Sequence, residues 1–429
     1  MPSSTILLCG GGTGGHVYPA LAVATAIVGV EEEQGNRGTE EQRGRGTGGQ
    51  RNRGTEEQGN RGTEEQRGRG TGQGDCGVVL VYVGSVGGME ERIVATESSL
   101  PFRALPAAAL RGRGPLALAR GATTMAAGLV AARSLIRELR PQVILGTGGY
   151  VCVPLFLAAT LARVPTLIYL PDLVPGLAGR LLARIATKVA VNVAEALPVL
   201  GLRPDNPRAL VVGYPLRPEF FEQEREACRR TFGFEAPLPV LLVYGGSRGA
   251  RSINQAIAQL LPDLLARCQI IHVCGREGDE TFLHKAAQSL PESLQVRYKL
   301  YPYLDGVTTP AMVAAFGAAD LAICRSGAST LAELPAAGLP AILVPYPYVH
   351  QDENADYLVR YGVAEKVADC AMIGTGPPQE GALFRAVARL LDDQLARQRM
   401  AEQSRALSRP DAAHELAGAM FGLAARSGG

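Results

Sequence analysis

The sequence predicts an α/β protein made of two doubly wound domains that face a shared cleft. Short apolar strands alternate with helical segments along most of its 429 residues, as in parallel sheets covered by helices. Glycine-rich turns follow several strands directly in both halves, and ligands bind at such strand ends in doubly wound sheets. The turn-rich run GYPLRP at 213–218 separates the halves and is the predicted hinge.

The composition, with 20% charged and 46% apolar residues, is that of an ordinary globular protein. A net charge of +2 without a concentrated basic stretch argues against a nucleic-acid partner. The eight cysteines are scattered without a CxxC pair, so we expect neither a zinc site nor a disulfide framework. The most apolar window, 151–170, is interrupted by two prolines and an arginine, which makes it a poor membrane span.

The first glycine turn, GGGTGGH at 10–16, lies between a predicted strand at 5–9 and a predicted helix at 19–30. It satisfies GxGxxG, the pattern of a dinucleotide site. Such a site also needs an acid at the end of the second strand, but glycine and serine follow the strand at 78–83. A nicotinamide-dependent oxidoreductase is therefore only an alternative, which a titration with NADH would test.

Residues 35–74 form five octads of the type GNRGTEEQ and contain no apolar residue. Because they cannot bury a face, we predict that the insert at about 31–76 is disordered and dispensable for chemistry. From Glu31 to Asp75 the chain carries 8 Arg against 9 Glu and 1 Asp, so the insert is not a polycationic arm. It joins a helix to the next strand and should emerge opposite the strand ends that bind ligands.

Two further segments of the first half are candidates for binding. Arg111 and Arg113 lie in a glycine-rich loop beside leucines, which suits an anionic membrane surface or a pyrophosphate. A solvated loop before a core helix explains these arginines equally well. A second glycine turn, GTGGY at 146–150, follows the buried strand at 143–145, so two glycine loops are expected to line one crevice.

The second half repeats the alternation of strands and helices, and ends in two predicted helices split near 408–410. Its first predicted strands are 240–244, 270–274 and 297–300. Ser247 lies in the small-residue loop GGSRGA at 245–250, immediately before a helix. Its hydroxyl and the neighbouring amides can meet a phosphate there.

The most informative stretch runs from Leu321 to Ala355. It is predicted to contain strand 321–324, a turn, helix 328–337 and strand 341–344. Free N–H groups at the start of this helix point into the crevice, a place that suits a phosphate. Glu333 shares a helix face with Ser329 and Thr330 and can accept two hydrogen bonds from a ribose diol. The alternative is an acid that the helix dipole favours in the first turn.

Six segments, in this order, resemble the MurG family of GT-B glycosyltransferases. They are GGTGGHVYPALA (11–22), GTGGYV (146–151), GGSRGARSIN (245–254), CRSGASTLAEL (324–334), AAGLPAILVPYP (336–347) and HQDENA (350–355). The family moves N-acetylglucosamine from UDP-N-acetylglucosamine to undecaprenyl-pyrophosphoryl-N-acetylmuramyl-pentapeptide (lipid I), which gives lipid II in peptidoglycan synthesis. The segments span nearly the whole chain except the octads, so the combination is specific.

The resemblance implies that the donor is bound mainly by the second half. The residues implied to contact it are Arg217, Ser247, Leu304, Ala328, Ser329, Thr330, Glu333 and Gln351. Glu333 would hold the ribose, Gln351 the sugar hydroxyls and the main chain near Leu304 the uracil. Thr13, Gly14 and Gly15 would close over the sugar from the first half, beside His16. Arg111 and Arg113 would face the membrane and the lipid pyrophosphate.

The implied domains are 1–212, which faces acceptor and membrane, and 213–404, which binds the donor. A C-terminal helix within 405–429 would return to the first domain. The resemblance also implies a peripheral enzyme at the cytoplasmic face of the cell membrane. Its partners would be UDP-N-acetylglucosamine and an undecaprenyl-linked acceptor, with no cofactor.

The sequence departs from the family pattern around the cleft. YLPD at 169–172 stands where the family has His-Glu-Gln-Asn, so Asp172 can accept hydrogen bonds as the Asn did, but the adjacent acid is missing. GYP at 213–215 replaces Gly-Asn-Pro, and Arg248 replaces a Gln. Donor recognition is thus better supported than acceptor identity. A transferase with another acceptor, a UDP-sugar epimerase and a non-catalytic scaffold that binds UDP sugars remain alternatives.

The expected reaction is an in-line attack of the acceptor hydroxyl on the anomeric carbon, with inversion. His16 is the candidate general base because an imidazole titrates near neutral pH and lies at the turn that faces the cleft. A structural histidine that hydrogen-bonds the loop is the alternative, and Asp172 is the second candidate base. The chain contains no Asp-x-Asp, which fits a site that uses helix dipoles rather than a metal.

Overall fold

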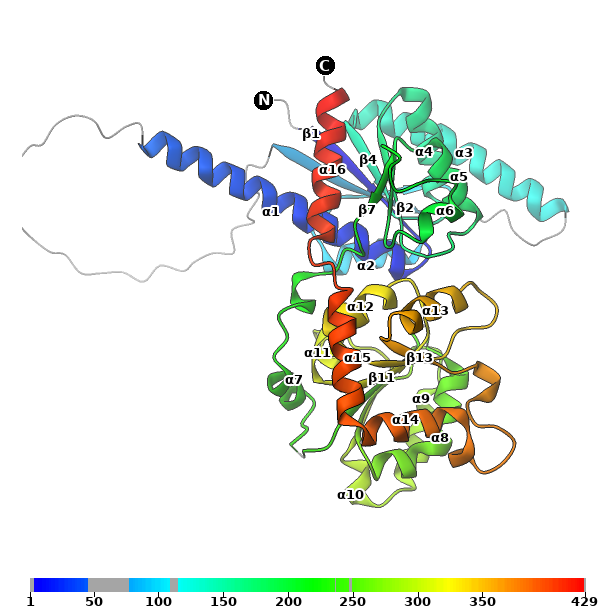
Figure 1. Ribbon diagram of the computed structural model, residues 1–429. Helices are drawn as coiled ribbons and strands as arrows, with labels where there is room; N and C mark the ends of the chain where they lie inside the picture. The colour runs from blue at the N-terminus through cyan, green and yellow to red at the C-terminus, as the bar shows by residue number, and fades with distance from the viewer. Residues whose placement is uncertain (1–3, 45–76, 109–114, 236, 247–248, 428–429) are drawn as a thin grey trace, which may run out of the picture.

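The computed structural model describes residues 4–44, 77–108, 115–235, 237–246 and 249–427, which form two α/β domains (Figure 1). The first domain contains a parallel sheet of seven strands in the order β3-β2-β1-β4-β5-β6-β7. These strands are β1 (Ser4–Cys9), β2 (Val78–Ser85), β3 (Phe102–Leu105), β4 (Val143–Gly146), β5 (Thr166–Leu170), β6 (Lys188–Val191) and β7 (Ala209–Val211). The strand order reverses between β1 and β4, so the two glycine turns that follow these strands lie at the switch point.

The second domain contains a parallel sheet of six strands in the order β10-β9-β8-β11-β12-β13. The strands are β8 (Val240–Tyr244), β9 (Gln269–Val273), β10 (Tyr298–Tyr301), β11 (Leu321–Cys324), β12 (Ala341–Leu343) and β13 (Ala364–Lys366). Its switch point lies between β8 and β11. The loops of the informative stretch and of the small-residue segment at 245–250 therefore meet there. The two sheets confirm the predicted fold class.

Helices cover both faces of each sheet (Figure 1). Those of the first domain are α1 (Gly14–Gly44), α2 (Met89–Glu97), α3 (Pro115–Leu139), α4 (Cys152–Ala162), α5 (Leu177–Ile185) and α6 (Ala196–Val199). Those that follow the hinge are η1 (Pro218–Phe220), α7 (Arg225–Thr231), α8 (Arg251–Leu265), α9 (Glu280–Gln288), α10 (Glu292–Gln295), α11 (Met312–Ala318), α12 (Thr330–Ala337), α13 (Asp352–Arg360), η2 (Asp369–Ala371), η3 (Pro378–Glu380), α14 (Ala382–Asp392), α15 (Gln394–Ala406) and α16 (Ala412–Ser427).

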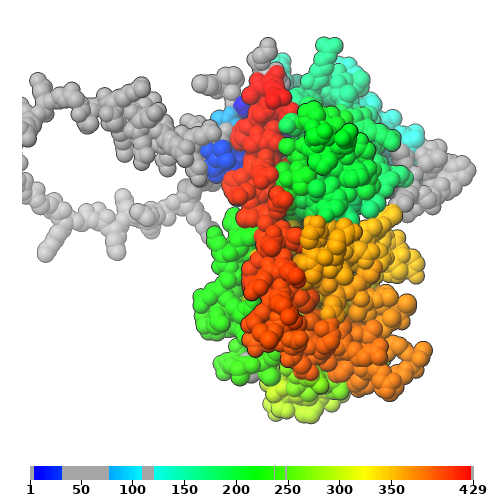
Figure 2. All heavy atoms as spheres, viewed as in Figure 1, coloured from blue at the N-terminus to red at the C-terminus, as the bar shows by residue number. Residues whose placement is uncertain are grey.

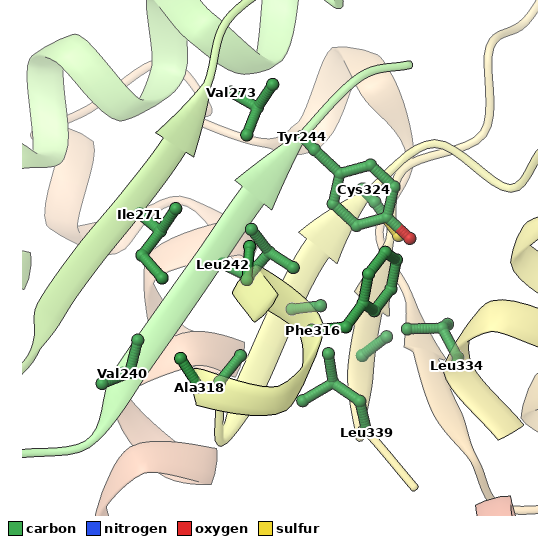
Figure 3. Packing of buried hydrophobic residues seen from close by; sticks show 14 of the residues in the cluster. Val240, Leu242, Tyr244, Ile271, Val273, Phe316, Ala318, Cys324, Leu334 and Leu339 are labelled. Carbon is green, nitrogen blue, oxygen red and sulfur yellow. The ribbon is translucent and has the colours of Figure 1, made fainter. Parts of the chain in front are cut away.

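The central strands read as continuous apolar runs because helices bury both of their faces. In the second domain, Val240 and Leu242 of β8 pack against α11 (Figure 3). Phe316 of α11 lies with its ring centroid 5.4 Å from that of Tyr244 and 5.5 Å from that of Phe220. This core fixes the end of β8, from which a loop of the candidate site departs.

The last helices cross from the second domain to the first. Helix α15 packs against α12, whereas α16 packs against α1 and β4. Figure 2 shows this C-terminal segment, in red, as a continuous strip over both domains. It runs beside the hinge at Gly213, where a Cβ atom would lie 2.5 Å from the Cβ of Arg409 and φ is +86°. Only glycine fits that position, since it has no Cβ and tolerates positive φ.

Three helical regions differ from the sequence prediction, and the first is α12, which begins at Thr330 rather than at Ala328. Three helices, not two, occupy the C-terminal region, because Asp393 separates α14 from α15 and its side chain accepts a hydrogen bond from the Ala396 amide (2.8 Å). Such a cap starts a new helix. Helix α1 begins at Gly14, not Pro19, and extends to Gly44, which takes it into the octads (Figure 1). Glu, Gln and Arg are strong helix formers, so a helix already started can continue through them. Residues 45–76 lie outside the described residues.

Candidate active site

The first glycine turn is fastened by a buried carboxylate that the sequence analysis did not identify. Glu90 of α2 has no exposed surface. Its Oε1 accepts hydrogen bonds from the Ser85 amide (2.7 Å) and from the Ser85 hydroxyl, and its Oε2 accepts one from the Gly12 amide (3.3 Å). An acid thus lies near the end of the second strand after all. It binds the protein's own backbone, so it is not available to a dinucleotide ribose.

The second glycine turn supports the residue that follows the first. The Thr147 hydroxyl donates to the carbonyl of His16, and the imidazole of His16 lies against Gly148. A Cβ atom at Gly148 would lie 2.6 Å from Nδ1 of His16, and φ there is +114°, so the position requires glycine. The Nδ1 atom is buried without a hydrogen-bond partner among the described residues.

His16 and Asp172 lie close enough to influence each other's ionisation. Burial lowers the pKa of His16, and the carboxylate of Asp172 acts in the opposite direction. Burial raises the pKa of Asp172, while the imidazole of His16, a hydrogen bond from Asn354 and the imidazole of His350 lower it. The lowered pKa favours the neutral imidazole, which is the form that accepts a proton. The structure thus brings the two candidate bases together.

Asn354 of α13 links this region to the second domain. Its Oδ1 accepts a hydrogen bond from the Leu173 amide (3.3 Å), and its Nδ2 donates to the carbonyl of Ser326 (3.0 Å). Ser326 is fully buried and donates its hydroxyl to the carbonyl of Gln351 (2.8 Å). One asparagine therefore connects the segment that carries Asp172 with the loop after β11.

The loop after β11 ends in a helix start with free donors. The amides of Gly327, Ala328 and Ser329 donate no hydrogen bond within the described part of the chain. They lie at the N-terminus of α12, where the helix dipole adds partial positive charge. The Thr330 side chain is buried, and its hydroxyl donates to the carbonyl of Arg325 (3.2 Å). Such a helix start suits an anionic group.

Glu333 lies one turn further along α12. Its Oε2 accepts a hydrogen bond from the Ser329 hydroxyl (3.0 Å), and its Oε1 accepts none from the described residues. Burial raises the pKa of Glu333 to about 7, although the hydrogen bond from Ser329 lowers it. A half-buried carboxylate with one free oxygen is suited to accept hydrogen bonds from a diol.

The other implied donor contacts also lie at strand ends of the second sheet. The Gln351 Oε1 accepts a hydrogen bond from the Tyr346 amide (2.9 Å), which leaves the amide donors of Gln351 for a ligand. Leu304 is 5% exposed, so its side chain belongs to the core. The Leu304 backbone N–H and C=O have no backbone hydrogen-bond partner among the residues that the structure describes.

The implied donor contacts of the first domain lie in the glycine turn after β1. Thr13 is exposed, and Gly14 and Gly15 are half-buried.

Arg325 organises the loops around this site, a role that its sequence position did not reveal. Its guanidinium donates to the carbonyl of Val344 (2.9 Å), the carboxylate of Asp369 (2.6 Å) and the hydroxyl of Ser252 (2.7 Å). The three acceptors belong to the segment after β12, to η2 and to α8. One arginine therefore holds together the segments that surround the start of α12.

Several contacts cross between the domains near the hinge. Arg217 forms an ion pair with Glu97 of the first domain (3.5 Å) and lies over the ring of Tyr18, 5.8 Å from its centroid. The Tyr18 hydroxyl hydrogen-bonds to Glu97 (2.9 Å) and to the hydroxyl of Tyr303 (3.2 Å). Arg217 thus connects the start of the second domain with α1 and α2 of the first. Ser247, Arg248, Arg111 and Arg113 lie outside the described residues.

The structure adds two observations on ligands and membranes, each limited to the part of the chain it describes. No group of three or more His, Cys, Asp or Glu side chains has the arrangement of a metal site there. No helix in the described ranges is both long enough and apolar enough to cross a membrane.

Two doubly wound domains, with glycine turns at the switch point of one sheet and a helix start beside a carboxylate at the switch point of the other, have the architecture of GT-B glycosyltransferases. Family comparisons agree: the Glycosyltransferase family 28 N-terminal domain matches residues 74–191 and the corresponding C-terminal domain matches residues 240–416. The chain belongs to glycosyltransferase family 28 and, within it, to the MurG family.

The chain is 53% identical to the UDP-N-acetylglucosamine--N-acetylmuramyl-(pentapeptide) pyrophosphoryl-undecaprenol N-acetylglucosamine transferase of Roseiflexus sp. (strain RS-1), over 97% of this chain and 94% of that protein. It is 38% identical to the transferase of that name from Desulforudis audaxviator, over 95% of both proteins. The crystal structure of Acinetobacter baumannii MurG has the same fold, with a TM-score of 0.66 and 23% identity over 98% of this chain and 99% of that one.

Proposed function

We propose that this protein transfers N-acetylglucosamine from UDP-N-acetylglucosamine to lipid I, with inversion at the anomeric carbon, to form lipid II. Near full-length identity of 53% to a transferase of that name supports this activity. The observation that carries it is the start of α12, where three free amides precede the half-buried carboxylate of Glu333. A nucleoside diphosphate offers an anion for the amides and a ribose diol for the carboxylate.

The donor is bound through the strand ends of the second domain. The free amides of Ala328 and Ser329, with Thr330 and the loop that contains Ser247, hold the pyrophosphate. The ribose diol donates to Glu333, whose Oε1 is free. The uracil meets the unpaired main chain at Leu304, because the Leu304 side chain is buried.

The sugar lies between the two domains. Gln351 donates its side-chain amide to the sugar hydroxyls, since its Oε1 is already occupied by a backbone amide. Thr13, Gly14 and Gly15 close over the sugar from the first domain. Arg217 approaches the donor from the hinge, although its guanidinium pairs with Glu97 in this structure. Substrate binding would then exchange that ion pair for a contact with the donor.

In the chemical step, the acceptor hydroxyl oxygen forms a bond to the anomeric carbon as the bond from that carbon to the phosphate oxygen breaks. UDP leaves with the electron pair, and the free amides at the start of α12 stabilise its added negative charge. The hydroxyl proton moves to Nε2 of His16. Burial lowers the pKa of His16, so the imidazole is neutral and ready to accept that proton near pH 7.

Asp172 supports His16 and is not the first choice of base. Burial raises the pKa of Asp172, and Asn354 lowers it while it holds the adjacent Leu173 amide to the second domain. A negative charge beside an imidazole stabilises the imidazolium that forms when the proton arrives. We assign His16 as the base and Asp172 as the group that stabilises its protonated form.

The two domains would bind different substrates. Residues 1–212 would face the acceptor and the membrane and residues 213–404 would bind the donor, while α16 (Ala412–Ser427) packs back onto the first domain. The protein would act as a peripheral protein at the cytoplasmic face of the membrane. Exposed leucines on the neighbouring helices α4 and α5 support this role, because Leu161 is 65% exposed and Leu177 is 71% exposed. Leu157 and Leu181 of the same two helices are also exposed.

The test is transfer of radiolabelled N-acetylglucosamine from UDP-N-acetylglucosamine to a lipid I analogue by the purified full chain. UDP-glucose serves as a competing donor, and lipid II, whose acceptor hydroxyl is already occupied, is the matched control acceptor. We expect one sugar to be added to lipid I alone, with the opposite anomeric configuration. Donor binding without transfer would overturn the acceptor assignment. Conversion of the donor to its epimer without an acceptor would point to the epimerase alternative.

A further inference from the structure

The hinge tyrosine Tyr214 contacts the chain segment that carries His16. Tyr214 is 3% exposed, and its hydroxyl donates to the carbonyl of Gly15 (3.1 Å), the residue immediately before His16. Burial raises the pKa of Tyr214, so its hydroxyl stays protonated and remains a donor. A residue of the interdomain connection thus reaches the first turn of α1.

The Gly15 carbonyl has a reason to need this donor. In an α-helix it would accept a hydrogen bond from the amide four residues later, but that residue is Pro19, which has no N–H. The first turn of α1 therefore contains a carbonyl that the helix itself cannot satisfy in this way. The hydroxyl of Tyr214 supplies the missing donor.

The ring of Tyr214 also touches the strand that leads to the second candidate base. Its centroid lies 6.2 Å from that of Tyr169 in β5, with an angle of 75° between the rings. Tyr169 is fully buried, and its hydroxyl has no hydrogen-bond partner in the described part of the chain. Asp172 follows three residues later. Tyr214 therefore packs between the two segments that carry His16 and Asp172.

We propose that Tyr214 is a positioning residue that ties His16 to the interdomain hinge through the Gly15 carbonyl left open by Pro19. Because Tyr214 belongs to the chain connection, rotation of the second domain about Gly213 also moves the point to which the His16 turn is attached. Closure over the donor and placement of the base are thereby coupled. This inference rests on the proposed role of His16 as general base.

The test is a double-mutant cycle of Tyr214→Phe and Pro19→Ala, measured in the full-length enzyme. Tyr214→Phe removes one hydrogen bond and should lower kcat about 3- to 10-fold. Its KM for UDP-N-acetylglucosamine should stay within about twofold, since the donor contacts lie in the second domain. Pro19→Ala gives position 19 an N–H that can bond the Gly15 carbonyl, so in that background the loss caused by Tyr214→Phe should fall below about twofold.

Tyr169→Phe is the matched control, because it removes a buried tyrosine hydroxyl that has no partner among the described residues. It should leave kcat and KM within about twofold of the wild type. An equal loss from Tyr214→Phe with and without the Pro19→Ala substitution, or no loss at all, would overturn the proposal. A purely structural role would lower the fraction of active protein, which lowers the apparent kcat without changing KM. The kcat is therefore calculated per UDP-binding site, and a loss that disappears after this normalisation would overturn the proposal.

The melting temperature gives a readout that does not depend on the reaction. Tyr214→Phe should lower Tm by about 2–4 °C when Pro19 is present, and by less in the Pro19→Ala background. If the wild type shows no transfer but the cycle in Tm shows this coupling, the hydrogen bond is right and the proposed function is wrong. If transfer is normal and both cycles are additive, the function stands and the inference fails.

Discussion

Glu333 gives the most specific prediction, because the carboxylate that is proposed to bind the ribose also lowers the stability of the folded protein. Burial raises its pKa from 4.5 to about 7. A carboxyl whose pKa is higher in the folded state loses its proton first in the unfolded state as the pH rises. The free energy of unfolding therefore falls between pH 4.5 and about 7 and stays reduced above that range.

The magnitude follows from about 1.36 kcal/mol for each pKa unit. Keeping Glu333 ionised at pH 8 costs the folded state at most about 3 kcal/mol, and its partial exposure lowers the expected cost to about 1–3 kcal/mol. Glu333→Gln removes the charge but keeps an oxygen for the Ser329 hydroxyl. The variant should thus be more stable than the wild type by about 1–3 kcal/mol at pH 8 and by less than about 1 kcal/mol at pH 5.

The assay is urea unfolding at both pH values followed by circular dichroism, since the chain contains no tryptophan for fluorescence. The affinity for UDP, measured by calorimetry at pH 8, should fall about 10- to 100-fold because a charged acceptor of the diol is lost. Ser329→Ala is the control: the Ser329 hydrogen bond lowers the pKa of Glu333, so its removal should deepen the loss of stability above pH 7. A stability gain of equal size at pH 5 and pH 8, or unchanged UDP affinity, would refute the reasoning.

Three further predictions concern the first domain. Asp172→Asn removes a charge that raises the pKa of His16, so the acidic limb of the pH profile of kcat/KM should move to lower pH. An unchanged limb would show that Asp172 does not influence the ionisation of the general base. Glu90→Ala leaves the partly buried amides of Gly12 and Ser85 without their acceptor and should lower the free energy of unfolding by about 1–3 kcal/mol in chemical denaturation. A loss below about 0.5 kcal/mol would contradict this role. Leu161→Asp combined with Leu177→Asp should reduce co-sedimentation with anionic vesicles while transfer to a water-soluble acceptor analogue is retained; undiminished vesicle binding would place the membrane contact elsewhere.

The sequence predicted the local parts of this fold well. The strands 240–244 and 321–324 were predicted to the residue, because fully buried parallel strands are uninterrupted apolar runs bounded by turn residues. The helix start near Ala328 was also recognisable from its small residues and the acid at Glu333. Both features depend on neighbours within a few positions, so the amino-acid pattern contains them.

Contacts made across the fold were beyond that pattern. Glu90 lies in the first turn of α2, shortly after two glycines. From the sequence alone it resembles any acid that the helix dipole favours in a first turn. Its function is to bind the Gly12 amide, 78 positions away in the chain. Asn354 likewise belongs to a recognised motif, but its link to the Asp172 segment exists only when the domains meet.

In the proposed mechanism, the second domain binds the donor and His16 of the first domain removes the proton. The most direct test measures His16→Ala in two assays, UDP-N-acetylglucosamine binding and single-turnover transfer to the lipid I analogue. We predict a Kd within about twofold of the wild type, and a transfer rate lower by about 100- to 10,000-fold. A variant that transfers at more than about a tenth of the wild-type rate would contradict the assignment of His16 as general base and move that role to Asp172 or another group.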